Sequence, residues 1–105
     1  MREKLINLEN KNIIITGEYL LPYFVNGRKT GRYVFRNIRD IEGNELADHM
    51  ILRLDTSFEK LNLHPYDVIS VEGIVHKYKR ENGTIDYGIK VPYNIRVVLK
   101  NIKGG

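Results

Sequence analysis

The pattern of hydrophobic and polar positions along the chain predicts β-strands rather than long helices. From Asn12 to Val25 the sequence is rich in β-branched and aromatic residues, which favours a strand, and Gly17 within it permits a bend or a bulge. Pro22 would interrupt a central ladder, so we expect this strand to end or kink there. Residues 1–10 show no clear period and are either a short helix or a loose lead-in.

A hairpin is predicted from Arg32 to Leu54, with its turn at residues 40–44. Phe35 and Ile38 are three residues apart in its first strand, which ends at residue 40, and a bulge would explain that spacing. The second strand, residues 45–54, alternates better, although Asp48 falls on the apolar face. We expect one face to carry Leu46, Met50, Leu52 and Leu54, and the other Ala47, His49, Ile51 and Arg53.

The connections around these strands are predicted from glycine, asparagine and proline. Residues 26–31 contain an Asn-Gly pair and a second glycine, so we expect a mobile, basic loop. Asp55, Thr56 and Ser57 can cap a short helix through residues 58–61, which would plug one end of a barrel.

The last third of the chain predicts a second hairpin. A turn at residues 64–67 precedes a strand over residues 68–78, in which Ile69, Val71, Gly73 and Val75 face inward. A tip at residues 79–84 returns through residues 85–90, and Pro92 separates this segment from a final strand, residues 93–99. We find no internal repeat, linker or low-complexity segment.

Length and composition favour one domain spanning residues 1–105, with a core of about residues 12–100. The 42% hydrophobic and 29% charged residues are typical of soluble globular proteins. The absence of cysteine excludes disulfides, thiolate metal sites and cysteine nucleophiles, and agrees with our expectation of a cytoplasmic protein. The first apolar run is too short for a signal peptide, and no run approaches the length of a membrane span.

Charge is arranged in three blocks along the chain. Residues 1–39 carry 8 basic and 3 acidic side chains, residues 40–72 carry 2 and 8, and residues 73–105 carry 7 and 2. If the two basic blocks meet in space, the fold has one cationic face suited to phosphates. The alternative is charge that serves only solubility.

The order of three strands, a short helix and two further strands resembles the OB-fold, an all-β, five-stranded Greek-key barrel with one short helix. Residues 63–75 are similar to the fourth strand of that family, with Tyr66 where glycine is usual. Residues 35–40, followed by Gly43, resemble the second strand and turn of tRNA-anticodon-type OB domains, and Gly17 also matches. The resemblance spans roughly residues 12–100.

Members of this family mostly bind single-stranded nucleic acid, oligosaccharide or protein across strands two and three, between two flanking loops. The resemblance therefore implies a nucleic-acid-binding surface. We expect Tyr33, Tyr78 and Tyr87 to face solvent and stack on bases, whereas Phe35 either stacks or packs in the core. The candidate residues are Arg28, Lys29, Arg32, Tyr33, Phe35, Arg36, Arg39, Lys77, Tyr78, Lys79, Arg80 and Tyr87.

Other chemistries are not supported by the sequence. His49, His64 and His76 do not have the spacing of metal ligands, and no phosphate-cradling glycine loop or catalytic constellation is present. We therefore expect no enzyme activity, metal or cofactor. The prediction is a single-stranded DNA-binding protein with little base preference, serving DNA replication, recombination or transfer, as a homo-oligomer or with a replication-protein partner. The alternatives are an RNA-binding accessory domain and a protein-interaction module.

Overall fold

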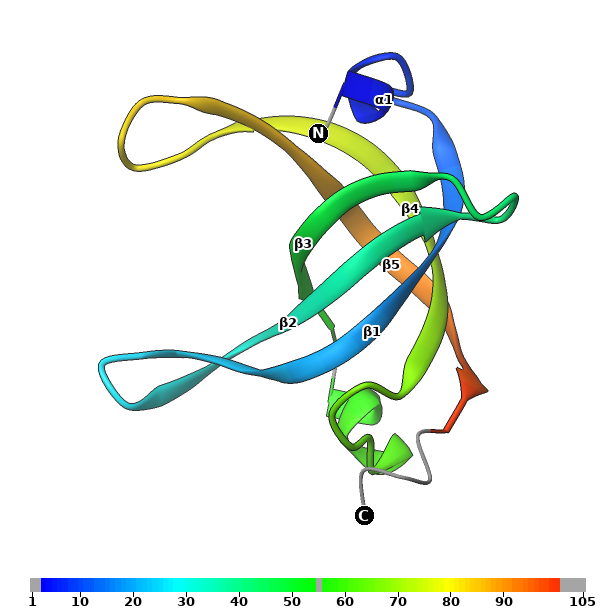
Figure 1. The fold of residues 1–105 in the computed structure, drawn as a ribbon. Helices are drawn as coiled ribbons and strands as arrows, with labels where there is room; N and C mark the ends of the chain where they lie inside the picture. The colour runs from blue at the N-terminus through cyan, green and yellow to red at the C-terminus, as the bar shows by residue number, and fades with distance from the viewer. Residues whose placement is uncertain (1–2, 55, 101–105) are drawn as a thin grey trace.

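A computed structural model describes residues 3–54 and 56–100, with the side chains of residues 56 and 57 left aside. Its elements are α1 (Glu3–Ile6), β1 (Asn12–Val25), β2 (Arg28–Asp40), β3 (Glu45–Arg53), the 3-10 helix η1 (Thr56–Leu61), β4 (Val68–Lys79) and β5 (Ile85–Leu99). The strands form one antiparallel sheet in the order β3-β2-β1-β4-β5 (Figure 1). The predicted cap of Asp55, Thr56 and Ser57 lies outside the described residues.

The sheet is strongly curved, so that its two edge strands, β3 and β5, approach each other (Figure 1). The concave side encloses the hydrophobic core. Helix α1 contacts β3 and β5 at one end of this core, where Leu5 is buried, and η1 covers the other end with Phe58. The predicted β-sheet with a short helix between the third and fourth strands is confirmed. For residues 1–10, the first of the two alternatives, a short helix, is observed as the single turn α1.

Neither proline ends a strand, so the predicted separation at Pro92 is wrong. For Pro22, which we expected to end or kink β1, the strand continues and its register with β2 shifts before and after the proline. Past Glu18, β1 pairs only with β2, so one edge of the segment that contains Pro22 faces no strand, and proline is tolerated there. In β5, Pro92 lies at a bulge opposite Gly73. A Cβ at Gly73 would lie 3.1 Å from the carbonyl oxygen of Lys90 and 3.5 Å from the Cα of Pro92, so the glycine makes room for the irregular backbone.

The bulge predicted from the spacing of Phe35 and Ile38 is confirmed. The register of β1 and β2 shifts between Thr16 and Glu18, where β2 contains one more residue than β1. Asn37 occupies the left-handed region at the bulge, with φ 54°, and both Phe35 and Ile38 are buried. Gly17 faces the bulge, where a Cβ would lie only 2.9 Å from Ile38 Cδ1.

The same bulge occurs a second time, between β4 and β5. Asn94 has φ 55°, and the register shifts between Ser70 and Glu72. Each asparagine donates from Nδ2 to a glutamate on the neighbouring strand and accepts at Oδ1 from the arginine two residues later; the sets are Glu18, Asn37 and Arg39, and Glu72, Asn94 and Arg96. The sequence Asn-Ile-Arg is thus repeated, a similarity of three residues that we did not recognise as an internal repeat.

A further bulge changes the predicted faces of β3. Ile38 pairs with Ala47 and Arg39 with Glu45, which leaves Leu46 as an extra residue. Leu46 and Ala47 are therefore both buried, so the outward placement of Ala47 is wrong. Asp48 is exposed rather than on the apolar face. The other expected positions are confirmed: Met50, Leu52 and Leu54 are buried, and His49, Ile51 and Arg53 are exposed.

Candidate nucleic-acid interface

Two long hairpins, β1–β2 and β4–β5, extend to the same side of the molecule (Figure 1). The β1–β2 hairpin turns at Asn26 and Gly27, both with positive φ, as in the two-residue turns that match strand twist. The predicted extent of the loop, residues 26–31, is therefore wrong, because β2 already begins at Arg28 and only the Asn-Gly pair forms the turn. Arg28 and Lys29 are exposed on a ribbon, and Lys29 Nζ lies 3.5 Å from Glu59 Oε1.

Tyr33 and Phe35 belong to the core. Their exposed fractions are 6% and 0%, so the expectation of a solvent-facing Tyr33 is wrong. Of the two alternatives for Phe35, the structure shows packing in the core. The Tyr33 ring lies 4.5 Å from that of Phe58, and its hydroxyl donates to Glu59 (3.3 Å). Burial, together with the Glu59 carboxylate, raises the pKa of Tyr33. Neither ring is available for stacking on a base.

The convex side of β2 and β3 carries three cross-strand pairs, which we call the β2–β3 face. Because Tyr33 and Phe35 point into the core, their neighbours on β2 point outward. The pairs are Arg32 with Arg53, Val34 with Ile51, and Arg36 with His49. Leu21 of β1 pairs with Val34 on its other side, so an apolar row of Leu21, Val34 and Ile51 lies between the arginine pair and Arg36.

The Arg32–Arg53 pair has no compensating charge. Like charges directly opposite each other on neighbouring strands are destabilising. Both side chains are exposed, and within the described ranges neither has an ion pair or a hydrogen bond through its guanidinium group. An anion bound between them would remove the repulsion, which makes this pair a candidate phosphate contact.

The next two arginines of β2 have partners in the fold. Arg36 Nε lies 2.8 Å from Glu18 Oε1, and its guanidinium lies 4.2 Å from the ring centre of Tyr66. Arg39 donates to the side chain of Asn37 (3.0 Å) and to the carbonyl oxygen of Gly43 (2.7 Å). Hydrogen bonds from Asn37 and Arg36 lower the pKa of Glu18. Arg36 remains exposed beside the apolar row, whereas Arg39 is held toward the β2–β3 turn.

Strand alternation divides the predicted residues of the β4–β5 hairpin between two faces. Lys77 pairs with Tyr87, and Lys79 pairs with Ile85. By strand alternation these residues lie on the concave side of the ribbon, the same side as the buried Val71 and Val75. Tyr78 lies on the convex side. Lys77 and Lys79 are exposed and form no ion pair with another described residue, whereas Tyr87 packs against the edge of the core.

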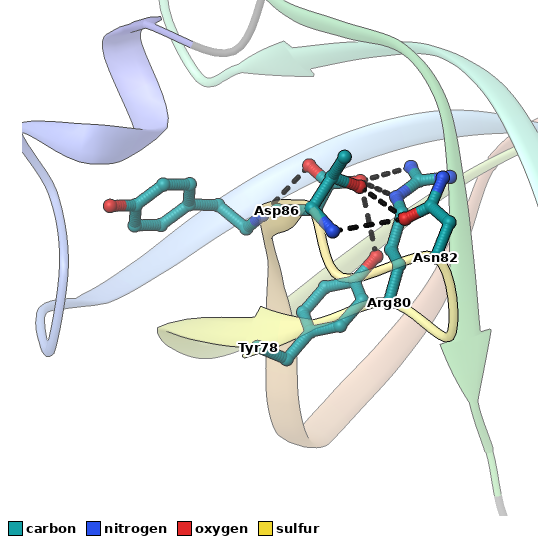
Figure 2. Close-up of polar contacts among 6 residues, drawn as sticks. Tyr78, Arg80, Asn82 and Asp86 are labelled. Atoms are coloured by element: carbon teal, nitrogen blue, oxygen red, sulfur yellow. Dashed lines mark hydrogen bonds and ion pairs between the residues drawn. The ribbon is translucent and has the colours of Figure 1, made fainter.

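Arg80 and Asp86 hold the end of this hairpin together (Figure 2). Arg80 donates from Nε (2.8 Å) and from Nη2 to Asp86 Oδ2, and the Tyr78 hydroxyl donates to the same oxygen (3.3 Å). Asp86 is 8% exposed. The charge of Arg80 is therefore compensated, and its contribution to a phosphate site is reduced.

Sequence reasoning missed several residues of the candidate interface. Arg53 and Ile51 were placed outward, but their partners Arg32 and Val34 follow only from the register. Tyr66 is 44% exposed and has φ 74°, a backbone conformation that glycine adopts more easily. The sequence has tyrosine at this position, where the resembled family usually has glycine, and this difference could have pointed to Tyr66. The missed residues are Leu21, Val34, Ile51, Arg53 and Tyr66.

The described part of the chain gives less support to two other kinds of site, a ligand groove and a metal site. A groove of about 280 Å³ adjoins η1, but the Glu59 carboxylate at its rim already contacts Tyr33 and Lys29. No group of three or more acidic, histidine or cysteine side chains among residues 3–54 and 56–100 could hold a metal ion. Within these ranges, no helix has the length and apolar character needed to cross a membrane.

Comparison with known proteins gave no match to a family model, to a curated protein or to a solved structure.

Proposed function

We propose that the chain is an OB-type Greek-key barrel that binds single-stranded DNA with little base preference, in replication, recombination or transfer of DNA. The barrel is supported by the strand order, by η1 between β3 and β4, and by the approach of the two edge strands. Direct pairing of β3 with β5 would close it. No catalytic role or cofactor is proposed.

The observation that carries this proposal is the Arg32–Arg53 pair, which has no compensating charge among the described residues, beside an apolar row in which Leu21 and Ile51 are exposed and Val34 is half-buried. Single-strand binding requires cations for the backbone together with surfaces that accept unpaired bases. Successive outward rows on a strand are about 6.6 Å apart, so phosphates can lie at the arginines while bases pack on Leu21, Val34 and Ile51. The exposed Lys77 and Lys79, on a hairpin extending to the same side, add positive charge.

Fluorescence titration with labelled dT, rU and duplex oligonucleotides at two salt concentrations tests this function. We expect the single strands to bind more tightly than duplex, with affinity that falls as salt rises. An Arg32→Gln/Arg53→Gln variant should bind more weakly, and its logarithmic salt slope should be shallower by about 1.4, since each contact on a single strand contributes about 0.7.

A Lys11→Gln/Lys60→Gln variant is the matched control, because it removes two exposed cations from other parts of the chain. It should retain the salt slope of the wild type. The arginine variant should also unfold at a slightly higher temperature, since it loses a like-charge contact. Equal affinity of all three proteins for dT, or tighter binding of duplex, would contradict the proposal.

A protein-interaction module is the second candidate. It is favoured by apolar side chains of β5 that lie on the surface: Val91, Val98 and Leu99 are 68%, 57% and 63% exposed. Sedimentation of the free protein over a range of concentrations separates the two functions. Self-association without binding of dT or rU would favour the interaction module, and tighter binding of rU than of dT would favour the RNA-binding alternative.

A further inference from the structure

The convex side of the β4–β5 ribbon carries aromatic and basic side chains in successive rows. The cross-strand pairs on this side are Tyr78 with Asp86, His76 with Gly88, Ile74 with Lys90, Glu72 with Tyr93, and Ser70 with Arg96. We name five of these residues the ribbon ladder: His76, Tyr78, Lys90, Tyr93 and Arg96. The ladder lies on β4 and β5, which do not pair with β2 or β3 in the sheet, so it is made of other residues than the β2–β3 face.

The first ring of the ladder is held in place by contacts on three sides. The Tyr78 hydroxyl is bonded to Asp86, and its ring stacks on His76 with centroids 5.5 Å apart and planes 28° apart. A Cβ at Gly88 would lie 3.3 Å from Tyr78 Cε1 and 3.7 Å from His76 Nε2, so the two rings lie close to the ribbon backbone. Tyr78 is still 37% exposed.

The second ring is fixed by its hydroxyl. Tyr93 donates to Glu72 Oε1 (3.3 Å), and its oxygen accepts from Asn12 Nδ2 (2.9 Å). Asn12 belongs to β1, so the side chain of Tyr93 reaches across β4 while 45% of the residue stays exposed. An aromatic side chain already ordered in the free protein loses little conformational entropy when a base stacks on it.

Two exposed cations accompany these rings. Lys90 has no ion pair with another described residue, and Arg96 uses only Nε, in a hydrogen bond to Asn94 (3.2 Å). The one carboxylate between them, Glu72, already accepts hydrogen bonds from Tyr93 and Asn94. The rows of Glu72 and Tyr78 are six residues apart on β4, about 20 Å, which is long enough for several nucleotides.

We propose that the ribbon ladder is a second contact surface for single-stranded nucleic acid, which engages strands too long for the β2–β3 face alone. Bases stack on Tyr78 and Tyr93, and phosphates lie near Lys90 and Arg96. This inference rests on the proposed function, since it extends the path of the same ligand. Aromatic side chains interleaved with cations are the general composition of single-strand binding surfaces.

The test compares dT oligomers of about 6 and about 20 nucleotides, which span the range of site sizes for small single-strand binding domains. Tyr93→Ala should weaken binding of the long oligomer by at least about fivefold, the lower end of a lost stacking contact, and narrow the difference in affinity between the two lengths. Tyr93→Phe, which keeps the ring but loses the hydroxyl contacts, should weaken it less.

Lys90→Gln/Arg96→Gln should likewise weaken binding of the long oligomer, whereas the Lys11→Gln/Lys60→Gln control should not. Circular dichroism and thermal unfolding establish that each variant is folded. If the wild type binds the long oligomer and the ladder variants bind it equally well, the proposed role of the ribbon ladder is contradicted. The proposed function of the β2–β3 face is then unaffected. If the wild type binds neither length, both proposals fail together.

Discussion

At the scale of single residues, Glu18 links the bulge of β2 to acid stability. Its carboxylate accepts hydrogen bonds from Asn37 and Arg36, and these hold its pKa below the ordinary value of 4.5. A lowered carboxylate pKa stabilises the folded state above the unfolded pKa, and this contribution is lost as pH falls through the folded pKa. The wild type should therefore lose stability on acidification below about pH 4.5.

Thermal unfolding followed from about pH 7 to about pH 3 measures this effect. Glu18→Gln should lower the melting temperature at neutral pH and should flatten its decrease in acid. Part of the decrease should remain, because hydrogen bonds from the residues of the β2–β3 turn also lower the pKa of Asp40. A variant with the same acid dependence as the wild type would show that Glu18 has no such role.

Gly73 is the residue at which added volume has least room. A Cβ there would overlap with Ile89 Cγ2 and lie 3.1 Å from the carbonyl oxygen of Lys90, so Gly73→Ala requires the Ile89 side chain or the backbone of β5 to shift. We expect a loss of about 1–3 kcal/mol in the free energy of unfolding, the usual cost of overpacking, measured by urea denaturation. Gly88→Ala should cost less, because its nearest neighbour is a side-chain atom, Tyr78 Cε1, at 3.3 Å, and no backbone atom lies closer. Equal losses of stability in Gly73→Ala and Gly88→Ala would contradict the conclusion that Gly73 makes room for the bulge of β5.

At the scale of elements, the two asparagine bulges share the same hydrogen-bond pattern but lie in different surroundings. Asn37→Ala should cost about 1–2 kcal/mol, because it removes two side-chain hydrogen bonds and places alanine at positive φ. Asn94→Ala should cost less, since Asn94 is exposed on an edge strand whereas Asn37 is half-buried between central strands.

Chemical denaturation of both alanine variants, with Asn37→Gly as a third, measures these contributions. The glycine variant should recover part of the loss, because glycine adopts positive φ at little cost. Identical unfolding of the glycine and alanine variants would assign the whole effect to the hydrogen bonds.

Local patterns in the sequence predicted the elements but not their lengths. The spacing of Phe35 and Ile38 identified a bulge correctly, because burial constrains both residues. Pro22 was expected to end or kink its strand and Pro92 to separate two strands, yet both strands continue: Pro22 lies where β4 no longer pairs with β1, and Pro92 lies opposite Gly73. A local pattern contains no information about such partners.

The candidate interface was harder to predict than the fold, because register decides which side chains meet. The predicted hairpin brings the segments of Arg32 and Arg53 together, but only the register shows that the two residues face each other directly. Tyr33 and Tyr78 look equivalent in sequence, but one lies under η1 and the other on the convex side of a ribbon. Composition could identify a basic and aromatic protein but could not select the faces.

At the scale of the whole molecule, the two long hairpins and the β2–β3 turn lie on opposite sides and differ in charge. The basic hairpins extend to one side, and the turn between β2 and β3, which carries Asp40, Glu42 and Glu45, lies on the opposite side (Figure 1). Such asymmetry steers an anionic ligand toward the hairpin side. The separation is not complete, because Glu59 contacts Lys29 of the β1–β2 hairpin, and Glu81 and Asp86 lie on the β4–β5 hairpin.

Hydrogen exchange measured by mass spectrometry tests the arrangement of the two hairpins. In the free protein, amides in the outer parts of both hairpins should exchange faster than those of β1 and β4 where these strands pair, because fewer buried contacts protect them. Addition of a long dT oligomer should slow exchange in both hairpins and in β3. Protection confined to one hairpin would mean that the hairpins do not act on a shared ligand.

The chain has seven tyrosines and no tryptophan, so its intrinsic fluorescence comes from tyrosine, and these residues include a buried and an exposed group. Tyr19 and Tyr33 are sealed against η1, so their emission changes when the interior comes apart. Tyr66, Tyr78 and Tyr93 are open to a dissolved quencher such as iodide, so their emission responds to whatever covers the outside. Quenching recorded in one cuvette would therefore distinguish the arrival of an oligonucleotide from the onset of denaturation, with no attached dye.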